Sequence, residues 1–315
     1  MSLCLLALGS NLGDRQHHLR AAVEALEENA SVDRLSVSQS LENVSIGGPT
    51  GQGEFLNAAI LVETNLSPWE LLTLTQEIER GQGRKPSQKW DARPLDIDLI
   101  LYDDLVVQTT QLTLPHPWLP VRRFVLEPAV QIASQLRHPV FDWSIDEMFQ
   151  HLSAPQRFVV IAGPYQAELS SLAAHLSCDY VPDPLNRRPA AAVPVMEQPI
   201  EFWQQRWDAL MASSWCREQT SIISEFWVGH SPWKICQDLG SSEYPSLLQQ
   251  RQVQAIVPPK LLINCRSSND SCGSDNPGPG RKEFPWLNLT ATSVERFRDE
   301  VSSAYLSMTD GSSKR

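Results

Sequence analysis

The chain has 315 residues, 42% of them hydrophobic and 20% charged, so it can build two domain cores and is not globally disordered. Its formal net charge of −11 provides no long-range attraction for nucleic acid or for an anionic membrane, so neither is an expected partner. The six cysteines lack the spacing of a zinc site or a disulfide framework, and the absence of a leader or long apolar run predicts a soluble, cytoplasmic protein.

Hydrophobic periodicity predicts the elements of the first half. Apolar residues run from Leu3 to Leu8, as in a buried strand, and recur at helical spacing after Asp14. In chain order, the expected elements are a strand at 3–8, a helix at 14–28, a strand at 32–41, a loop at 46–53, a strand at 55–62, a helix at 67–79, a polar loop at 81–90, a strand at 95–102, a proline-rich turn at 112–120 and a helix at 124–132 that Pro128 interrupts. This order predicts an α+β fold with one sheet and a helical layer.

A second domain is expected after a linker at 153–156, because a fresh apolar run at 158–163 follows a completed α+β unit. The predicted domains are therefore 1–153 and 157–315. Further along the chain, the expected elements are a loop at 181–195, a tryptophan-rich helix at 200–215, a helix at 244–253, a strand at 261–263, a mobile polar segment at 269–280 and a helix at 294–306.

Two carboxylates, Asp96 and Asp98, form the strongest chemical signal. Residues i and i+2 of a strand point to the same face, with Cα atoms roughly 6.5 Å apart, so both side chains can bind one or two hard cations. An ordinary exposed strand face is the alternative, and the pair alone does not decide between them.

A basic stretch lies immediately before these carboxylates and contains Arg84, Lys85, Lys89 and Arg93. Cations beside carboxylates suit a metal–polyphosphate complex, because phosphoryl transfer requires mainly positioning and charge neutralisation. Solvated loop charges are the alternative interpretation.

Several segments share the spacing of one enzyme family. They are GSNLGD at 9–14, FLNAA at 55–59, RPLDIDL at 93–99, LPHP at 114–117 and RRFVLEP at 122–128. Together they resemble the 6-hydroxymethyl-7,8-dihydropterin pyrophosphokinases of folate biosynthesis over about residues 2–152. The resemblance implies a ferredoxin-like α+β fold and transfer of pyrophosphate from ATP to the pterin hydroxymethyl group, which leaves AMP.

The resemblance also implies roles for individual residues. Two Mg²⁺ ions, bound with ATP, would be held by Asp96 and Asp98, and Arg84 and Arg93 would complete the catalytic set. The pterin would lie between Phe55 and Phe124. The implied ATP-binding residues are Glu79, Lys89, Trp90, Arg93, His116 and Arg122, and the implied pterin-binding residues are Asn43, Ile46, Phe55, Asn57, Asp96 and Phe124.

The chain departs from the family pattern in its substrate loop and its basic loop. Asn43-Val44-Ser45 stands where Thr-Pro-Pro or Glu-Pro is usual, so the rigidity of the substrate loop is expected to differ. Lys85 and Lys89 occupy positions where arginine is common, which keeps the charge and loses bidentate contact with phosphate. We therefore expect an active enzyme with altered kinetics.

The second half resembles a deoxynucleoside kinase over about residues 158–308, which implies an α/β fold of the P-loop kinase type. A phosphate-binding loop reads G-x-x-x-x-G-K-[ST], but after Gly163 this chain has Glu168 in place of glycine and Leu169 in place of lysine. We expect a degenerate loop and a catalytically inactive pseudo-kinase that serves stability, regulation or homodimer formation. An unrelated α/β domain is the alternative.

The predicted function is thus that of a pterin pyrophosphokinase with an appended inactive domain, and its expected partners are ATP and the hydroxymethyl dihydropterin. Two alternatives stay open at this point. One is a non-catalytic protein that binds pterin and ATP or acts as a scaffold. The other is a bifunctional enzyme whose second half still phosphorylates a nucleoside.

Overall fold

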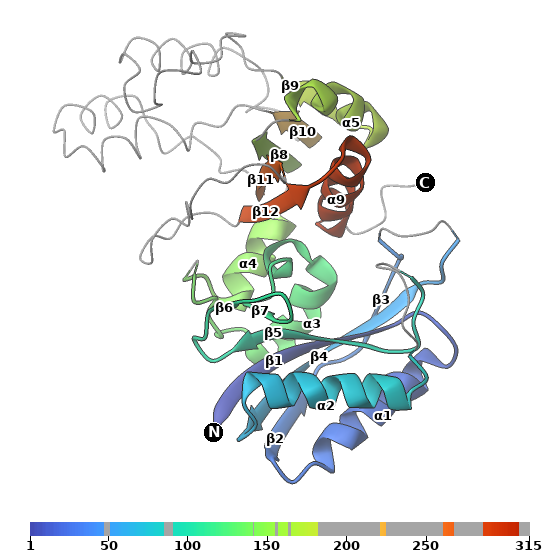
Figure 1. Cartoon of the computed structure of the whole chain (residues 1–315), viewed down its shortest axis with the longest axis vertical. Coiled ribbons are helices and arrows are strands. Elements are labelled where there is room, and N and C mark those ends of the chain that lie inside the picture. The colour runs from blue at the N-terminus through green and yellow to red at the C-terminus, as the bar shows by residue number, and fades with distance from the viewer. Residues whose placement is uncertain are drawn as a thin grey trace, which may run out of the picture. The chain divides into compact units, whose positions relative to one another are not determined.

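The computed structural model describes residues 1–46, 51–84, 91–140, 142–154, 157–162, 165–181, 221–224, 261–267 and 286–308. The chain divides into two compact units, of which the first is built around Met1–Ser153 (Figure 1). Its elements are β1 (Ser2–Ser10), α1 (Arg15–Glu27), β2 (Val32–Val37), β3 (Leu41–Asn43), β4 (Phe55–Thr64), α2 (Pro68–Gly81), β5 (Asp96–Tyr102), β6 (Val107–Gln108), β7 (Thr113–Leu114), the 3₁₀ turn η1 (Leu119–Val121), α3 (Arg123–Ala133) and α4 (Ile145–Ser153). The division of the sequence predicted at 153 and 157 remains a prediction.

The first unit is built on a sheet with the order β2-β4-β1-β5, in which neighbouring strands are antiparallel and β3 also pairs with β4. Strand β4 lies between β1 and β2, which α1 connects, and β1 lies between β4 and β5, which α2 connects. This is the split βαβ arrangement of ferredoxin-like folds. The predicted α+β fold, a sheet with helices, is confirmed for this unit.

Alternation along the strands decides which side chains face α1 and α2. One face of the sheet packs against these helices in a core that includes Cys4, Leu6, Leu8, Leu19, Leu26, Leu56, Ile60, Leu71, Ile97 and Leu99. The residues between them, Phe55 and Asn57 on β4 and Asp96 and Asp98 on β5, therefore point to the other face. Helix α3 lies beside β4 and β1 on that face (Figure 1).

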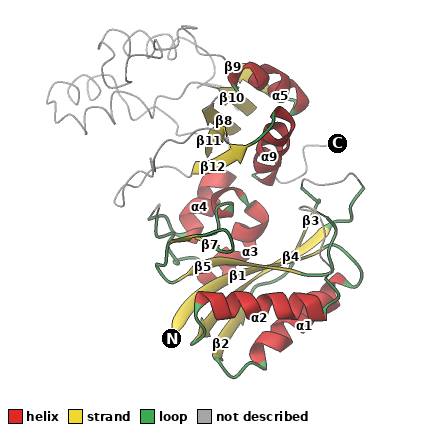
Figure 2. Ribbon diagram, viewed as in Figure 1, coloured by secondary structure: helices red, strands yellow, loops and turns green. Residues whose placement is uncertain are grey.

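The prediction of a single helical layer is therefore wrong, since helices cover both faces of the sheet (Figure 2). Helix α4 was not predicted, although its start carries a capping box: Ser144 Oγ accepts from the Glu147 amide, and the Glu147 carboxylate accepts from the Ser144 amide. Strands β6 and β7 were not predicted either, and β2 and β3 were predicted as one strand. Helix α3 continues through Pro128 where an interruption was expected.

The second unit, described by itself, contains a sheet with the order β12-β11-β8-β10-β9. The elements of this part of the chain are β8 (Arg157–Ala162), η2 (Gln166–Glu168), α5 (Leu169–His175), β9 (Asp179–Val181), β10 (Ser221–Ser224), β11 (Leu261–Ser267), β12 (Trp286–Ala291) and α9 (Val294–Ser307). Of β12 and α9, the second unit takes the residues between Asn288 and Arg298. Strand β8 pairs in parallel with β10 and β11, and β10 pairs in parallel with β9. Strand β11 and helix α9 agree with the strand predicted at 261–263 and the helix predicted at 294–306. Strands β9, β10 and β12 were not predicted.

Several predicted features of the second half lie outside the described residues, namely the loop at 181–195 beyond Val181, the helices at 200–215 and 244–253, and the polar segment at 269–280. Among the helices that the structure describes, none is long and apolar enough to cross a bilayer.

The loop before α4 contains a buried histidine, His138, which should make the free energy of unfolding depend on pH. His138 is 4% exposed, its Nδ1 accepts from the Val140 amide at 3.2 Å, and burial lowers its pKa to about 3. An unfolded histidine has a pKa of about 6.5, so between these values the unfolded state binds more protons. The stabilising contribution is thus fully present above about pH 6.5 and is lost as the pH falls toward 3.

We expect the free energy of unfolding to fall by about 2 to 3 kcal/mol through His138 alone between pH 6.5 and pH 4.5. The variant His138→Gln cannot take up this proton and should show a correspondingly smaller pH dependence in denaturant titrations. His17→Gln, an exposed position on α1, is the matched control. An unchanged pH dependence in His138→Gln would contradict the assignment.

Candidate active site

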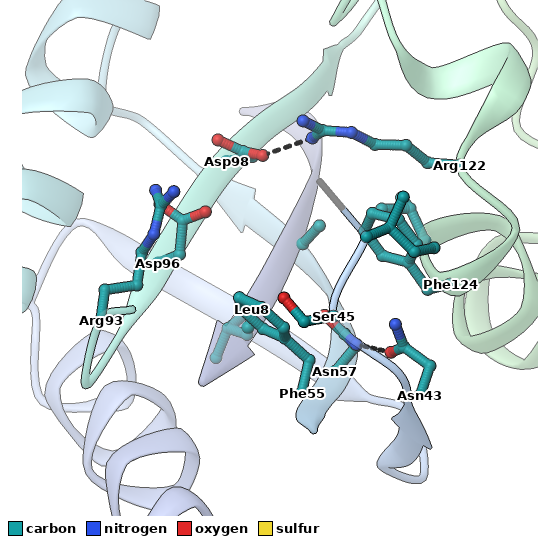
Figure 3. Close-up of a pocket in the computed structure, with 14 residues that line it drawn as sticks. Leu8, Asn43, Ser45, Phe55, Asn57, Arg93, Asp96, Asp98, Arg122 and Phe124 are labelled. Carbon is teal, nitrogen blue, oxygen red and sulfur yellow. Dashed lines mark hydrogen bonds and ion pairs between the residues drawn. The ribbon is translucent and has the colours of Figure 1, made fainter. Parts of the chain in front are cut away.

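A pocket opens at one end of the first unit's sheet, on the face that carries α3 (Figure 3). Its walls come from the ends of β1, β4 and β5, from the segment that follows β3, and from the start of α3. The pocket brings together many of the residues that the sequence analysis singled out, which are Asn43, Ile46, Phe55, Asn57, Arg93, Asp96, Asp98, Arg122 and Phe124. Gly9, Ser45 and Val125 also line it and were not predicted.

Asp96 is held between two arginines. Its Oδ1 lies 2.8 Å from Nη1 of Arg84 and 2.8 Å from Nη1 of Arg93, and the side chain keeps 24% of its surface exposed. Burial raises the pKa of Asp96 and the nearby Asp98 charge raises it further, while the Arg93 and Arg84 guanidinium groups oppose both effects. Two carboxylates this close repel one another, and a bound cation relieves that repulsion.

Asp98 faces Arg122 from the next position on the same face of β5. Its Oδ2 accepts from Arg122 Nη1 at 2.7 Å, and the guanidinium group also lies 5.7 Å from the centre of the Phe124 ring (Figure 3). Arg122 thus connects the carboxylate pair to the aromatic wall of the pocket.

His116 lies behind Asp98, with its Nε2 3.9 Å from Asp98 Oδ2. Burial, and then the Arg122 charge, hold the pKa of His116 well below its usual range, so the ring is neutral. Its Nδ1 accepts from the Trp118 amide at 3.1 Å, a shorter contact than the 3.5 Å from Arg122 Nη1 to Nε2. A neutral ring has one lone pair to offer, so Nε2 carries the proton and can donate to an anion.

Glu79 on α2 is only 6% exposed and is hydrogen-bonded to the backbone of β5. Its Oε1 accepts from the Ile97 amide at 2.7 Å and also contacts Arg84 Nη1, and burial raises the pKa of Glu79. These contacts favour a positioning role, since Glu79 holds Arg84 against Asp96. Its predicted contact with ATP stays a prediction.

Asn11 connects the segment before β5 to the segment before β4. The side-chain Oδ1 of Asn11 accepts from the backbone N–H of Arg93 at 2.8 Å, and the backbone N–H of Asn11 donates to the Arg93 carbonyl at 3.3 Å. The side-chain Nδ2 of Asn11 donates to Gln52 Oε1 at 2.9 Å. The Arg93 backbone is therefore fixed independently of its side chain. Asn11 belongs to the GSNLGD segment at 9–14, which these contacts join to both neighbouring segments.

The pterin-binding residues predicted from the sequence lie around the other end of the pocket. Phe55 and Phe124 are on opposite walls, from β4 and α3, and Asn57 lies between them and the β1 end (Figure 3). The Asn57 side chain donates from Nδ2 to Asn43 Oδ1, which joins β4 to β3. Lys85, Lys89 and Trp90 lie outside the described residues.

The donor set fits magnesium. Asp96 and Asp98 offer oxygen ligands only, and the described residues contain no group of three or more His, Cys, Asp or Glu side chains arranged around a metal position. Mg²⁺ is commonly bound by one or two carboxylates together with water and substrate phosphates, whereas an all-protein cage would suit another metal.

The chain shares its first half with a known group of enzymes. The family model described as "7,8-dihydro-6-hydroxymethylpterin-pyrophosphokinase (HPPK)" matches residues 5–134. A 2-amino-4-hydroxy-6-hydroxymethyldihydropteridine pyrophosphokinase of Bacillus subtilis (strain 168) is 41% identical over 135 residues, which is 43% of this chain and 80% of the relative. The protein with the same name from Aquifex aeolicus (strain VF5) is 38% identical over 141 residues, 45% of this chain and 86% of the relative.

Among solved structures, an HPPK-DHPS chain in complex with substrates covers 85% of this chain and 77% of its own length, with a TM-score of 0.37 and 10% identity. A likeness this distant carries no argument about the second unit.

Proposed function

Since this chain belongs to the 7,8-dihydro-6-hydroxymethylpterin-pyrophosphokinase family, we propose that it transfers pyrophosphate from ATP to 6-hydroxymethyl-7,8-dihydropterin, a step of folate biosynthesis that leaves AMP. One observation of the site carries this proposal. The pocket combines two facing aromatic rings and a buried amide at one end with paired carboxylates and arginines at the other. It can therefore hold a flat heteroaromatic ring beside a polyphosphate.

In the proposed complex, the pterin ring lies between Phe55 and Phe124, and its polar edge bonds to Asn57. This places the hydroxymethyl group toward Asp96, which lines the same pocket. Arg93 and Arg122, which form ion pairs with Asp96 and Asp98 in the structure, bind and orient the phosphates of ATP in this complex. His116, neutral with its proton on Nε2, donates to a phosphate oxygen. These groups position the two substrates and neutralise charge, and no covalent nucleophile is required.

Asp96 and Asp98 would hold Mg²⁺, for which we propose two ions. When bound with ATP, Mg²⁺ supplies further neutralisation of the charge on the phosphate oxygens. The protein contributes the fixed spacing of the carboxylates, because both project from the same face of β5.

The reaction is tested by incubating the purified full chain with ATP, MgCl₂ and 6-hydroxymethyl-7,8-dihydropterin and separating the nucleotides. We expect AMP to accumulate in equal amount to the pterin diphosphate, and to require the pterin. Formation of ADP in place of AMP would contradict pyrophosphoryl transfer. A chain that binds both ligands without turnover would support the non-catalytic alternative.

For the second unit we propose a degenerate P-loop-kinase-like domain that is catalytically inactive and has a structural or regulatory role. Two features support it. The first strand of this sheet, β8, lies in the interior of the order and pairs in parallel with β10 and β11, as in doubly wound α/β folds. Leu169, which stands where the phosphate-binding lysine would be, is fully buried, and Glu168 pairs with Arg298.

These positions predict that the second unit contributes no ATP turnover. Full-length chain carrying both Asp96→Asn and Asp98→Asn should release neither ADP nor AMP above background when given Mg²⁺, ATP and a mixture of nucleosides. The doubly substituted chain must retain the far-UV circular dichroism and melting transition of the wild type. ADP release that requires a nucleoside would favour the bifunctional alternative.

A further inference from the structure

The amide of Asn57 is held by a second amide, that of Asn43, at the wall of the pocket. Asn57 is 5% exposed on β4, and Asn43 ends β3, the strand that pairs with β4 through the register Leu41↔Asn57 and Asn43↔Phe55. Nδ2 of Asn57 donates to Oδ1 of Asn43 (Figure 3). Both side chains line the pocket.

The direction of this hydrogen bond is fixed by the backbone. Nδ2 of Asn43 donates to the Val44 carbonyl oxygen at 3.0 Å, and a carbonyl oxygen can only accept. The Oδ1 of Asn43 is thereby directed to Asn57, where it too can only accept. If the Asn57 side-chain amide were rotated by 180°, so that its oxygen and nitrogen exchanged places, its oxygen would face the Asn43 oxygen. If both side-chain amides were rotated in this way, the Asn43 oxygen would face the Val44 carbonyl. Either arrangement places two acceptors together, so only the observed orientation satisfies all three groups.

The position of the hydrogen-bond acceptor of Asn57, its Oδ1 atom, is therefore defined. Its Oδ1 is directed toward Gly9, where an added Cβ would come within 3.1 Å of that oxygen. Gly9 lines the pocket beside Phe55. We propose that Asn43 is a positioning residue that fixes the Asn57 amide with its oxygen toward the ligand, so that the site selects a ring edge that donates hydrogen bonds. This inference rests on the proposed function, since the amino and N–H groups of a pterin form such an edge.

Asn43 is the last residue of β3 and begins the Asn43-Val44-Ser45 segment. Here, a side-chain relay from the Val44 carbonyl through Asn43 to Asn57 ties the loop to the sheet.

The test is a double-mutant cycle on the full-length chain, read by equilibrium binding of the dihydropterin and by kcat and KM. We expect Asn43→Ala to weaken pterin binding about tenfold and to raise the KM for pterin by a similar factor, with a smaller change in kcat. In the Asn57→Ala background, the same Asn43→Ala change should have no further effect, because the group it positions is gone. Asn43→Asp keeps an acceptor for Asn57 but loses the donor to the Val44 carbonyl, so it should recover only part of the lost affinity.

Equal losses in the two backgrounds would overturn the inference, because they would show that Asn43 acts on the loop and not through Asn57. An Asn43→Asp variant as weak as Asn43→Ala would overturn it as well, since an acceptor alone would then not position Asn57. Melting curves of each variant separate a fold defect from a binding defect. A wild-type chain that forms no AMP contradicts the proposed function itself, whereas an active wild type with failed coupling contradicts only the role of Asn43.

Discussion

Asp96→Asn is expected to lower kcat/KM for pyrophosphoryl transfer by at least about 1,000-fold, which corresponds to about 4 kcal/mol of transition-state stabilisation. The substitution keeps the shape of the side chain and removes one of the two charges that would hold Mg²⁺. It also removes the carboxylate that holds Arg84 and Arg93 in place, each 2.8 Å from Oδ1. The metal position and the orientation of both cations are therefore lost together.

The measurement is the rate of AMP formation across a range of Mg²⁺ concentrations. We expect the loss to be only partly recovered at high Mg²⁺, because a neutral amide oxygen remains as a weak ligand. Asp104→Asn is the matched control, since Asp104 is exposed in the turn that follows β5 and lies at the end of the strand away from the pocket. Activity within tenfold of wild type in Asp96→Asn would show that the metal is not held by this strand.

Sequence reasoning worked well where one residue's role depends on its neighbours along the chain. The alternation of Asp96, Ile97 and Asp98 placed both carboxylates on one face of a strand, and the structure puts them on one face of β5 with Ile97 in the opposite core. The helices predicted at 14–28 and 67–79 are likewise present as α1 and α2. Local chemistry of this kind is written in a few consecutive residues.

Long-range pairing could not be predicted in the same way. The relay from Val44 through Asn43 to Asn57 depends on the register of β3 against β4, and the ties of Asn11 to Arg93 and Gln52 span three loops. Neither follows from spacing along the chain. Helix α4 was missed for another reason: its amphipathic run is short, Ile145–Ser153, and follows directly on a polar turn. The second helical layer was not predicted because the sequence does not show that α3 packs on the face of the sheet opposite α1 and α2.

Arg93→Ala is the variant for which we expect the second largest effect, a loss of about 100- to 1,000-fold in kcat/KM. Arg93 is partly buried, with 19% of its side chain exposed, and it lines the pocket together with Asp96, which its guanidinium group contacts. In the proposed reaction, a cation fixed at this point would neutralise charge that develops on the transferred phosphates. Arg93→Lys should recover part of the loss, because the charge remains while bidentate contact does not.

Removal of the Arg93 side chain should affect the pocket without disturbing the backbone. The backbone of Arg93 is held on both sides by Asn11, whose Oδ1 accepts from its amide and whose amide donates to its carbonyl. Removing the guanidinium group should therefore leave β5 and the carboxylates where they are, and the melting temperature should change little. Arg80→Ala, an exposed arginine on α2 with 66% of its side chain accessible, controls for loss of a positive charge near the same loop. Equal activity of Arg93→Ala and Arg80→Ala would show that Arg93 serves the fold alone. Phosphate binding would then have to be assigned to another cation of the pocket, and Arg122 would be the first to test.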